Sequence, residues 1–157
     1  MNANLTGGCS CGAVRYRLTS DPMFVNCCHC LDCQRHTGSA FALNAIIETG
    51  HIVIESDEPV PVELTAGSGR PLDIYRCPKC QTSVWSDYGR RPGLRFVRVG
   101  TLDDPGAVKP DAHIFIRSKQ PWVALPEDVP SFEDFYLKEM RELWPAGSIE
   151  RFQAAVG

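Results

Sequence analysis

The sequence has no long apolar run and no surplus of charge of one sign. Apolar stretches such as residues 45–47 are far shorter than the about 20 residues that cross a bilayer. The formal net charge of -3 at pH 7 gives no basic surface for nucleic acid or for an anionic membrane. Residues 1–14 have neither a basic start nor an apolar stretch of secretory length. We therefore expect a soluble, cytoplasmic protein without nucleic-acid or membrane partners.

The chain also lacks internal repeats, low-complexity tracts and any segment typical of an interdomain linker. Its 12 prolines and 13 glycines fall largely between short apolar runs, for example at residues 57–61 and 66–71. A chain of 157 residues is long enough to bury a core without covalent help. We expect a single domain over residues 1–157, with a core at about 5–130 and a helical C-terminal extension at 131–157.

The pattern of apolar residues predicts a mainly β fold with small antiparallel sheets. Apolar and basic side chains alternate over residues 13–18, as they do in a half-buried strand. Residues 45–47 and 52–54 flank a Glu-Thr-Gly-His segment, which we interpret as a hairpin. Further short strands are expected at residues 72–76, 82–86, 94–99 and 113–117.

Only the C-terminal part has helical periodicity. Ser131 can cap a helix, and Asp134 stands three residues later. Apolar residues then recur at helical spacing before Pro145, namely Phe132, Phe135, Tyr136, Met140, Leu143 and Trp144. We expect one helix of about three turns here, packed on the sheets.

Cysteine is abundant, and its spacing is the most specific signal in the chain. The cytosol keeps thiols reduced, so disulfides are not expected. The eight cysteines are Cys9 and Cys11, then Cys27, Cys28, Cys30 and Cys33, then Cys77 and Cys80. Clusters at this spacing are typical of metal-binding knuckles.

Two of these clusters can share one structural zinc ion. Such an ion takes four protein ligands in a tetrahedron, and thiolates are its usual ligands. The pair Cys77 and Cys80 needs a second pair from elsewhere in the chain, which Cys9 and Cys11 supply. A zinc ion here would tie the N-terminal strand to the middle of the chain.

The remaining ligands, Cys28, Cys30 and Cys33, form an open set. The fourth position can be taken by water, by a substrate, by Cys27 or by His29. Adjacent residues of an extended segment point to opposite sides, which disfavours Cys27. Zinc on three thiolates is a weak Lewis acid that lowers the pKa of an incoming thiol and leaves it nucleophilic. The open set therefore favours carbon–sulfur chemistry.

Other interpretations of this region stay open. His29 can complete a second closed structural site. Cys27 and Cys28 can form a redox pair, although no thioredoxin-like βαβ pattern surrounds them. Cys27 can also be an ordinary buried side chain. His51 is expected to be solvated, and His113 is expected to be a core or surface group rather than a ligand.

The cysteine motifs and their flanking residues resemble the glutathione-dependent formaldehyde-activating enzymes, a family that shares its domain with centromere protein V. The resemblance covers about residues 5–130 in order. The matching stretches are residues 7–16 (GGCSCGAVRY), 28–41 (CHCLDCQRHTGSAF), 75–85 (YRCPKCQTSVW), 100–105 (GTLDDP) and 113–122 (HIFIRSKQPW).

The resemblance implies a β-tent, zinc-ribbon-related fold built around two zinc ions. It places a structural zinc on Cys9, Cys11, Cys77 and Cys80, and a catalytic zinc on Cys28, Cys30 and Cys33. The activity implied is lyase-type carbon–sulfur chemistry, which joins formaldehyde to glutathione to give S-hydroxymethylglutathione. The alternative is a non-catalytic, zinc-stabilised module that carries glutathione or binds a protein partner.

A thiol that bears carboxylates needs cations near the open zinc. Arg35 is the main candidate, Arg15, Arg90 and Arg91 are weaker ones, and an ordinary surface arginine is the alternative for Arg35. His36 lies close enough in sequence to support a ligand.

Three residues of the chain depart from the family pattern. Gln81 stands where the family usually has glycine, Gln34 replaces a usual arginine, and Cys27 is an addition.

Overall fold

The computed structural model describes residues 4–157. Strands form most of its regular structure: β1 (Leu5–Gly8), β2 (Arg15–Leu18), β3 (Phe24–Cys28), β4 (Ala42–Glu48), β5 (Ile52–Ile54), β6 (Val60–Thr65), β7 (Pro71–Arg76), β8 (Ser83–Tyr88), β9 (Leu94–Arg98) and β10 (Ala112–Ile114). The helices are α1 (Leu31–Thr37), α2 (Met140–Leu143) and α3 (Ala146–Val156), with 3-10 turns η1 (Thr49–His51), η2 (Val99–Thr101), η3 (Pro105–Ala107) and η4 (Ile116–Ser118). The expectation of a mainly β fold with a C-terminal helix is confirmed.

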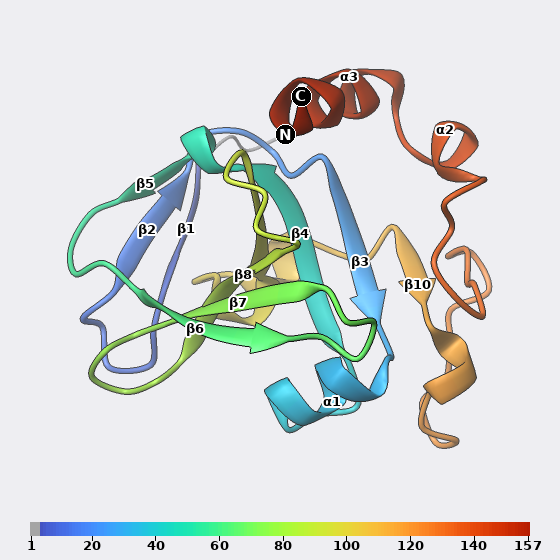
Figure 1. Cartoon of the computed structure of the whole chain (residues 1–157), viewed down its shortest axis with the longest axis horizontal. Helices are drawn as coiled ribbons and strands as arrows, with labels where there is room; N and C mark the ends of the chain where they lie inside the picture. Colours follow the sequence, from blue (N-terminus) through green and yellow to red (C-terminus); the bar gives the residue numbers. More distant parts are fainter. Residues whose placement is uncertain (1–3) are drawn as a thin grey trace.

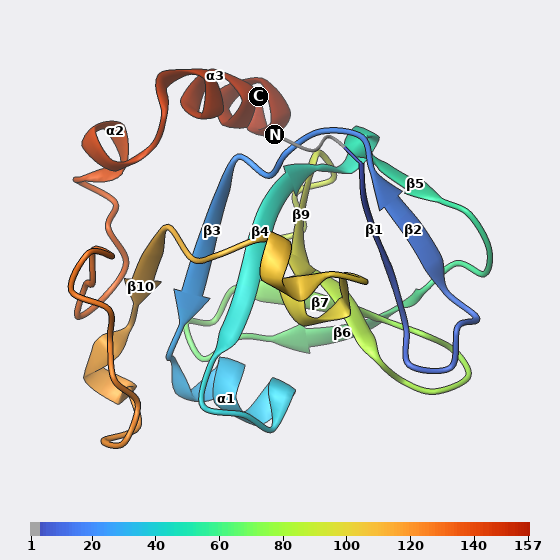
Figure 2. The same cartoon turned by 180° about the vertical axis from the view of Figure 1, so that it is seen from behind.

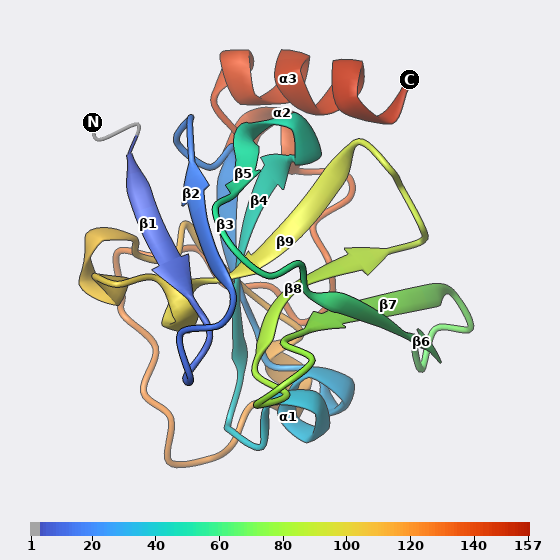
Figure 3. The same cartoon turned by 90° about the vertical axis from the view of Figure 1, so that its left-hand side faces the viewer.

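The strands form two sheets that lie against each other. The smaller sheet has the order β1-β2-β5, and the larger has the order β10-β3-β4-β9-β8-β7-β6. All neighbouring strands are antiparallel except β10 and β3, which run parallel. Figure 3 shows the small sheet on one side, with β6 to β9 splayed away from it. In Figure 1, α1 lies at one end of the strands and α3 at the other.

The main core fills the space between the two sheets. Along β2, Tyr16 and Leu18 are fully buried while Arg15 and Arg17 stay partly exposed, which confirms the predicted alternation. The rings of Tyr16 and Trp85 meet edge to face with centroids 5.5 Å apart. A second cluster of apolar residues lies on the other face of the large sheet and receives the C-terminal segment.

The hairpin predicted between residues 45–47 and 52–54 is wrong. β4 is paired on both sides, by β3 and β9, and has no free edge. The turn η1 carries the chain into the small sheet, where β5 pairs with β2 instead. Because β4 is buried on both faces, its place in the middle of the large sheet is set by the core rather than by the short turn that follows it.

The predicted helix at residues 131–144 is also wrong. Ser131 forms a bridge with His113, and the backbone N–H of Phe132 donates to the carbonyl of His113 at 2.9 Å, so this backbone pairs beside β10. Tyr136 is buried without being helical, and its hydroxyl donates to Asn26 at 2.7 Å. Of the predicted helix only the short α2 (Met140–Leu143) is helical, and Pro145, which lacks an N–H, separates it from the main helix α3.

Helix α3 packs on the second core cluster through Ile149 and Phe152, and an ion pair joins it to the end of β4. Arg151 donates to both carboxylate oxygens of Glu48, at 2.7 and 2.6 Å. The helix also approaches Gly93 so closely that a Cβ there would lie 2.1 Å from the carbonyl oxygen of Ala155. Among the described residues, no helix is long and apolar enough to cross a membrane.

Candidate metal centres

Four cysteines from distant parts of the chain meet at one point, which we name the four-cysteine cluster: Cys9, Cys11, Cys77 and Cys80. Their sulfur atoms lie within 4.8 Å of one another, and all eight cysteines of the chain are free of disulfides. The Cys9–Cys11 and Cys11–Cys77 sulfur distances are 3.6 and 3.8 Å. A tetrahedron with metal–sulfur bonds of about 2.3 Å has edges of about 3.8 Å. The cluster therefore fits one metal ion.

Backbone and hydroxyl donors around the four-cysteine cluster favour ionised sulfur. The N–H of Val14 donates to Cys9 Sγ at 3.2 Å, and the N–H of Lys79 donates to Cys77 Sγ at 3.4 Å. The hydroxyl and backbone N–H of Thr82 lower the pKa of Cys80 to about 5. A metal ion needs thiolates as ligands, so these contacts prepare the cluster for it.

A second group, the three-cysteine cluster, lies where β3 meets α1. It consists of Cys28 at the end of β3, Cys30 at the N-cap of α1 and Cys33 in its first turn. Hydrogen bonds from Cys28 and Cys33 bring the pKa of Cys30 far below its ordinary value, and those same contacts raise the pKa of Cys28. The N–H of Cys33 also donates to Cys30 Sγ at 3.3 Å. Three ligand atoms converge here, and the group contains one readily ionised sulfur.

Two residues that the sequence analysis missed lie beside the three-cysteine cluster. The hydroxyl of Tyr88 is 3.6 Å from Cys33 Sγ, and burial raises the pKa of this hydroxyl, which keeps it protonated. Arg98 is 7% exposed. The hydrogen bond with Cys28 lowers the pKa of Cys33, but the hydrogen bond with Cys30 and burial outweigh it and raise this pKa to about 11. The charge of Arg98 acts on this pKa in the lowering direction. Arg98 shares a strand face with the apolar Leu94 and Phe96. An arginine at a position where the predicted strand should carry an apolar residue is a signal in the sequence by which Arg98 could have been found.

A cavity of about 450 Å³ opens next to Arg98. Arg76 and His36 also line it, so two guanidinium groups and an imidazole face the same space. Arg98 donates to the side-chain oxygen of Asn44, while its Nε has no hydrogen-bond partner within residues 4–157. Arg98 therefore lines the cavity and acts electrostatically on Cys33, but no cysteine of the three-cysteine cluster lines the cavity.

Two of the arginines singled out from the sequence lie elsewhere. Arg35 is exposed on α1 and is not part of the cavity lining. Arg15 forms an ion pair with Asp103, to whose carboxylate its guanidinium donates at 2.8 and 2.5 Å. His36, in contrast, does lie in the cavity wall.

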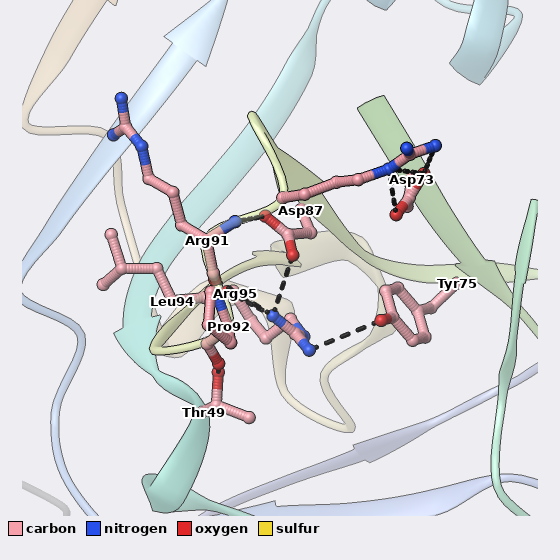
Figure 4. Close-up of polar contacts among 9 residues, drawn as sticks. Thr49, Asp73, Tyr75, Asp87, Arg91, Pro92, Leu94 and Arg95 are labelled. Carbon is pink, nitrogen blue, oxygen red and sulfur yellow. Dashed lines mark hydrogen bonds and ion pairs between the residues drawn. The ribbon is translucent and has the colours of Figure 1, made fainter. Parts of the chain in front are cut away.

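The other two arginines, Arg90 and Arg91, lie in the turn between β8 and β9, and Figure 4 shows the surroundings of Arg91. Arg90 donates to the carboxylate of Asp73 at 3.2 Å. The side chain of Arg91 points away from the contacts drawn, and only its backbone N–H reaches Asp87, at 2.7 Å. Arg95 forms the buried ion pair with Asp87 at 3.2 Å. These contacts stabilise the turn between the two strands.

A third group that can hold a metal ion consists of Cys27, His29 and His113. His29 therefore does not face the three-cysteine cluster, and the side chains of Cys27 and Cys28 belong to different groups. Burial raises the pKa of Cys27 to about 12, which disfavours the redox interpretation of this residue. His113, expected to be an ordinary core or surface group, is buried beside them.

A mainly β fold that gathers cysteines into a four-membered and a three-membered cluster defines a class of proteins with cysteine-rich centres that could hold metal ions. A family model described as glutathione-dependent formaldehyde-activating enzyme matches residues 4–118, and the chain belongs to this family.

Two individual proteins are similar to the chain. A Halomonas elongata protein that bears the family's name is 27% identical over 126 residues, which cover 77% of this chain and 80% of that protein. The crystal structure of a Rhodobacter sphaeroides protein has a TM-score of 0.50 at 18% identity and covers 81% of this chain and 99% of that one. The second likeness concerns the fold alone.

Proposed function

We propose that the chain is a zinc-dependent, lyase-type carbon–sulfur enzyme that adds a thiol such as glutathione to formaldehyde or a similar small aldehyde. The observation that carries the proposal is the open three-cysteine cluster. A cavity with two guanidinium groups lies elsewhere on the large sheet, and Arg98 in its wall acts electrostatically on Cys33. Membership of the family and the name of the Halomonas elongata relative support glutathione and formaldehyde as the substrates.

Two zinc ions per chain fit the two cysteine clusters. The four-cysteine cluster would hold a structural ion with a closed set of ligands. Cys28, Cys30 and Cys33 would hold a catalytic ion and leave one position for another ligand. When bound there, zinc supplies a site at which a thiol loses its proton and remains nucleophilic.

The residues of the chain then bind and orient the substrates. Arg98 and Arg76 face the cavity and can pair with the carboxylates of the thiol. The protonated hydroxyl of Tyr88 can donate a hydrogen bond to the oxygen that becomes negative when the thiolate adds to the aldehyde. Addition to a reactive aldehyde needs mainly proximity, so no separate general base is required.

Metal counting and cobalt substitution test this proposal. We expect two metal ions per chain in the intact protein and one in the Cys33→Ser variant. The thiolate-to-cobalt absorption should change when glutathione is added to the intact protein. Cys27→Ser, a neighbouring cysteine outside both clusters, is the matched control and should keep both ions and the response.

A second measurement separates catalysis from binding. NMR of the hemithioacetal, with and without the protein, gives the rate at which glutathione and formaldehyde combine. Faster formation with the intact protein, and not with Cys33→Ser, supports the enzyme. If glutathione changes the cobalt spectrum but the protein does not speed up hemithioacetal formation, the chain is a glutathione carrier rather than an enzyme. If glutathione never changes the spectrum, the proposal of an open metal site is overturned.

A further inference from the structure

Cys27, His29 and His113 come together because of the pairing of two strands. In the parallel pair of β3 and β10, Cys27 and His113 are register partners, and Figure 2 shows β10 alongside β3. His29 follows Cys27 by two residues and points to the same side, opposite to Cys28. Cys27 is 2% exposed, His29 0% and His113 6%. We name these three residues the histidine cluster.

Three potential ligand atoms of the histidine cluster converge on one point. Cys27 Sγ lies 3.5 Å from His29 Nε2, which in turn lies 2.9 Å from His113 Nδ1. The ring of Phe41 covers His29, with centroids 5.5 Å apart. The opposite ring nitrogens, His29 Nδ1 and His113 Nε2, are buried and have no hydrogen-bond partner in the described part of the chain. A buried site with a sulfur and two imidazoles is suited to a soft metal ion.

The charge of the site decides between candidate ions. One thiolate and two neutral imidazoles carry a charge of -1, so a monovalent ion makes the site neutral and a divalent ion leaves it positive. A buried, uncompensated charge is costly. The positive charge of Lys119 acts on His29 and adds to that cost. No fourth cysteine, histidine or carboxylate joins the group among residues 4–157, which also disfavours tetrahedral zinc.

We propose that Cys27, His29 and His113 form a three-coordinate site for a soft monovalent metal ion, Cu(I), distinct from both cysteine clusters. When the Cu(I)–sulfur bond forms, the thiol proton passes to solvent, and no electron is transferred. The two histidine nitrogens must separate by about 0.5 Å, because ligand nitrogens on one metal ion lie about 3.3–3.5 Å apart. The ion replaces their hydrogen bond.

Anaerobic titration of the zinc-loaded full chain with Cu(I), buffered by bicinchoninate, tests the site. We expect one Cu(I) per chain with no release of zinc, followed with a zinc indicator. X-ray absorption at the copper edge should show one sulfur and two nitrogen neighbours. No uptake, uptake that releases zinc, or a shell made only of sulfur would each overturn the proposal.

Variants test the individual ligands. Cys27→Ser and His113→Asn should each weaken Cu(I) binding by at least about 10-fold while keeping two zinc ions and the β-sheet circular dichroism. His51→Asn, which changes a histidine outside the cluster, is the control and should bind Cu(I) like the unchanged chain. If both ligand variants bind Cu(I) as tightly as the unchanged chain, the site is contradicted. If one variant does not fold, the other variant and the X-ray absorption spectrum still decide.

Discussion

Gln81 has a backbone conformation that usually belongs to glycine. Its φ of 63° lies in the left-handed region, in the turn that follows Cys80. Its carbonyl accepts a hydrogen bond from Arg76 at 3.1 Å, and its side chain is exposed. The departure from the family's usual glycine therefore leaves the turn intact but strained, because a Cβ disfavours this conformation.

Replacing Gln81 by glycine should stabilise the metal-loaded protein by about 0.5–1 kcal/mol, since the relief of strain exceeds the added freedom of the unfolded chain. Urea denaturation with constant zinc measures the change. Gln81→Ala keeps the Cβ and should give no gain. An equal gain in both variants would show that the side chain, not the backbone, is the cause.

Arg98 lines the cavity, and its charge acts on Cys33 of the three-cysteine cluster. Arg98→Lys should raise the KM for glutathione about 10-fold, because a lysine cannot form the paired hydrogen bonds that a guanidinium makes with a carboxylate. Steady-state kinetics with varied glutathione measure this. Arg35→Gln, on the exposed side of α1, should change the KM less than about 2-fold. A larger increase of the KM in Arg35→Gln than in Arg98→Lys would indicate that Arg35, not Arg98, binds the thiol.

Helix α3 is attached to the large sheet by apolar contacts of Ile149 and Phe152 and by an ion pair between Arg151 and Glu48. The side chains of Glu48 and Arg151 are 18% and 31% exposed. Burial raises the pKa of Glu48, but the hydrogen bonds from Arg151 outweigh this effect and bring the pKa below its ordinary value. The ion pair therefore stabilises the attachment above the ordinary pKa of a glutamate, and this stabilisation is lost as the pH falls through the lower, folded value.

Arg151→Met should loosen α3 without unfolding the sheets. At pH 7 we expect amide hydrogen exchange in α3 to become about 5-fold faster, which corresponds to about 1 kcal/mol. The difference from the unchanged chain should shrink near pH 4, where Glu48 begins to take up a proton. Glu150→Gln, an exposed change on the same helix, should leave the exchange unaltered. A difference that persists unchanged at low pH would exclude the ion pair as its cause.

At the scale of the whole molecule, the four-cysteine cluster joins the two sheets. Cys9 and Cys11 follow β1 of the small sheet, whereas Cys77 and Cys80 lie between β7 and β8 of the large one. Cys9 and Cys77 are also buried in the core between the sheets. An ion bound here stabilises a contact between segments that are far apart in the chain.

Loss of this ion should destabilise the whole fold. Structural zinc sites contribute about 10 kcal/mol or more in small domains, which is comparable to the total stability of a domain. Cys77→Ser should therefore lower the midpoint of thermal unfolding by more than about 10 °C. Cys30→Ser, a partly exposed ligand of the three-cysteine cluster, should lower it much less. Equal shifts in both variants would contradict a division into structural and open sites.

The sequence by itself determined most of the strands and the grouping of the knuckle cysteines, but it missed β1, β3 and β6. Alternation reports burial within a few residues, as at Tyr16 and Leu18, and ligand spacing such as Cys77-x-x-Cys80 is a local property. The family followed from the same local motifs.

Only the tertiary structure decided which segments lie beside one another. β5 pairs with β2 rather than β4, and the segment after Ser131 pairs beside β10 rather than forming a helix. Arg98 and Arg76 come from different strands to line one cavity. His113 joins Cys27 through the register of a parallel pair. Each of these contacts depends on packing between residues far apart in the chain, which a local pattern does not encode.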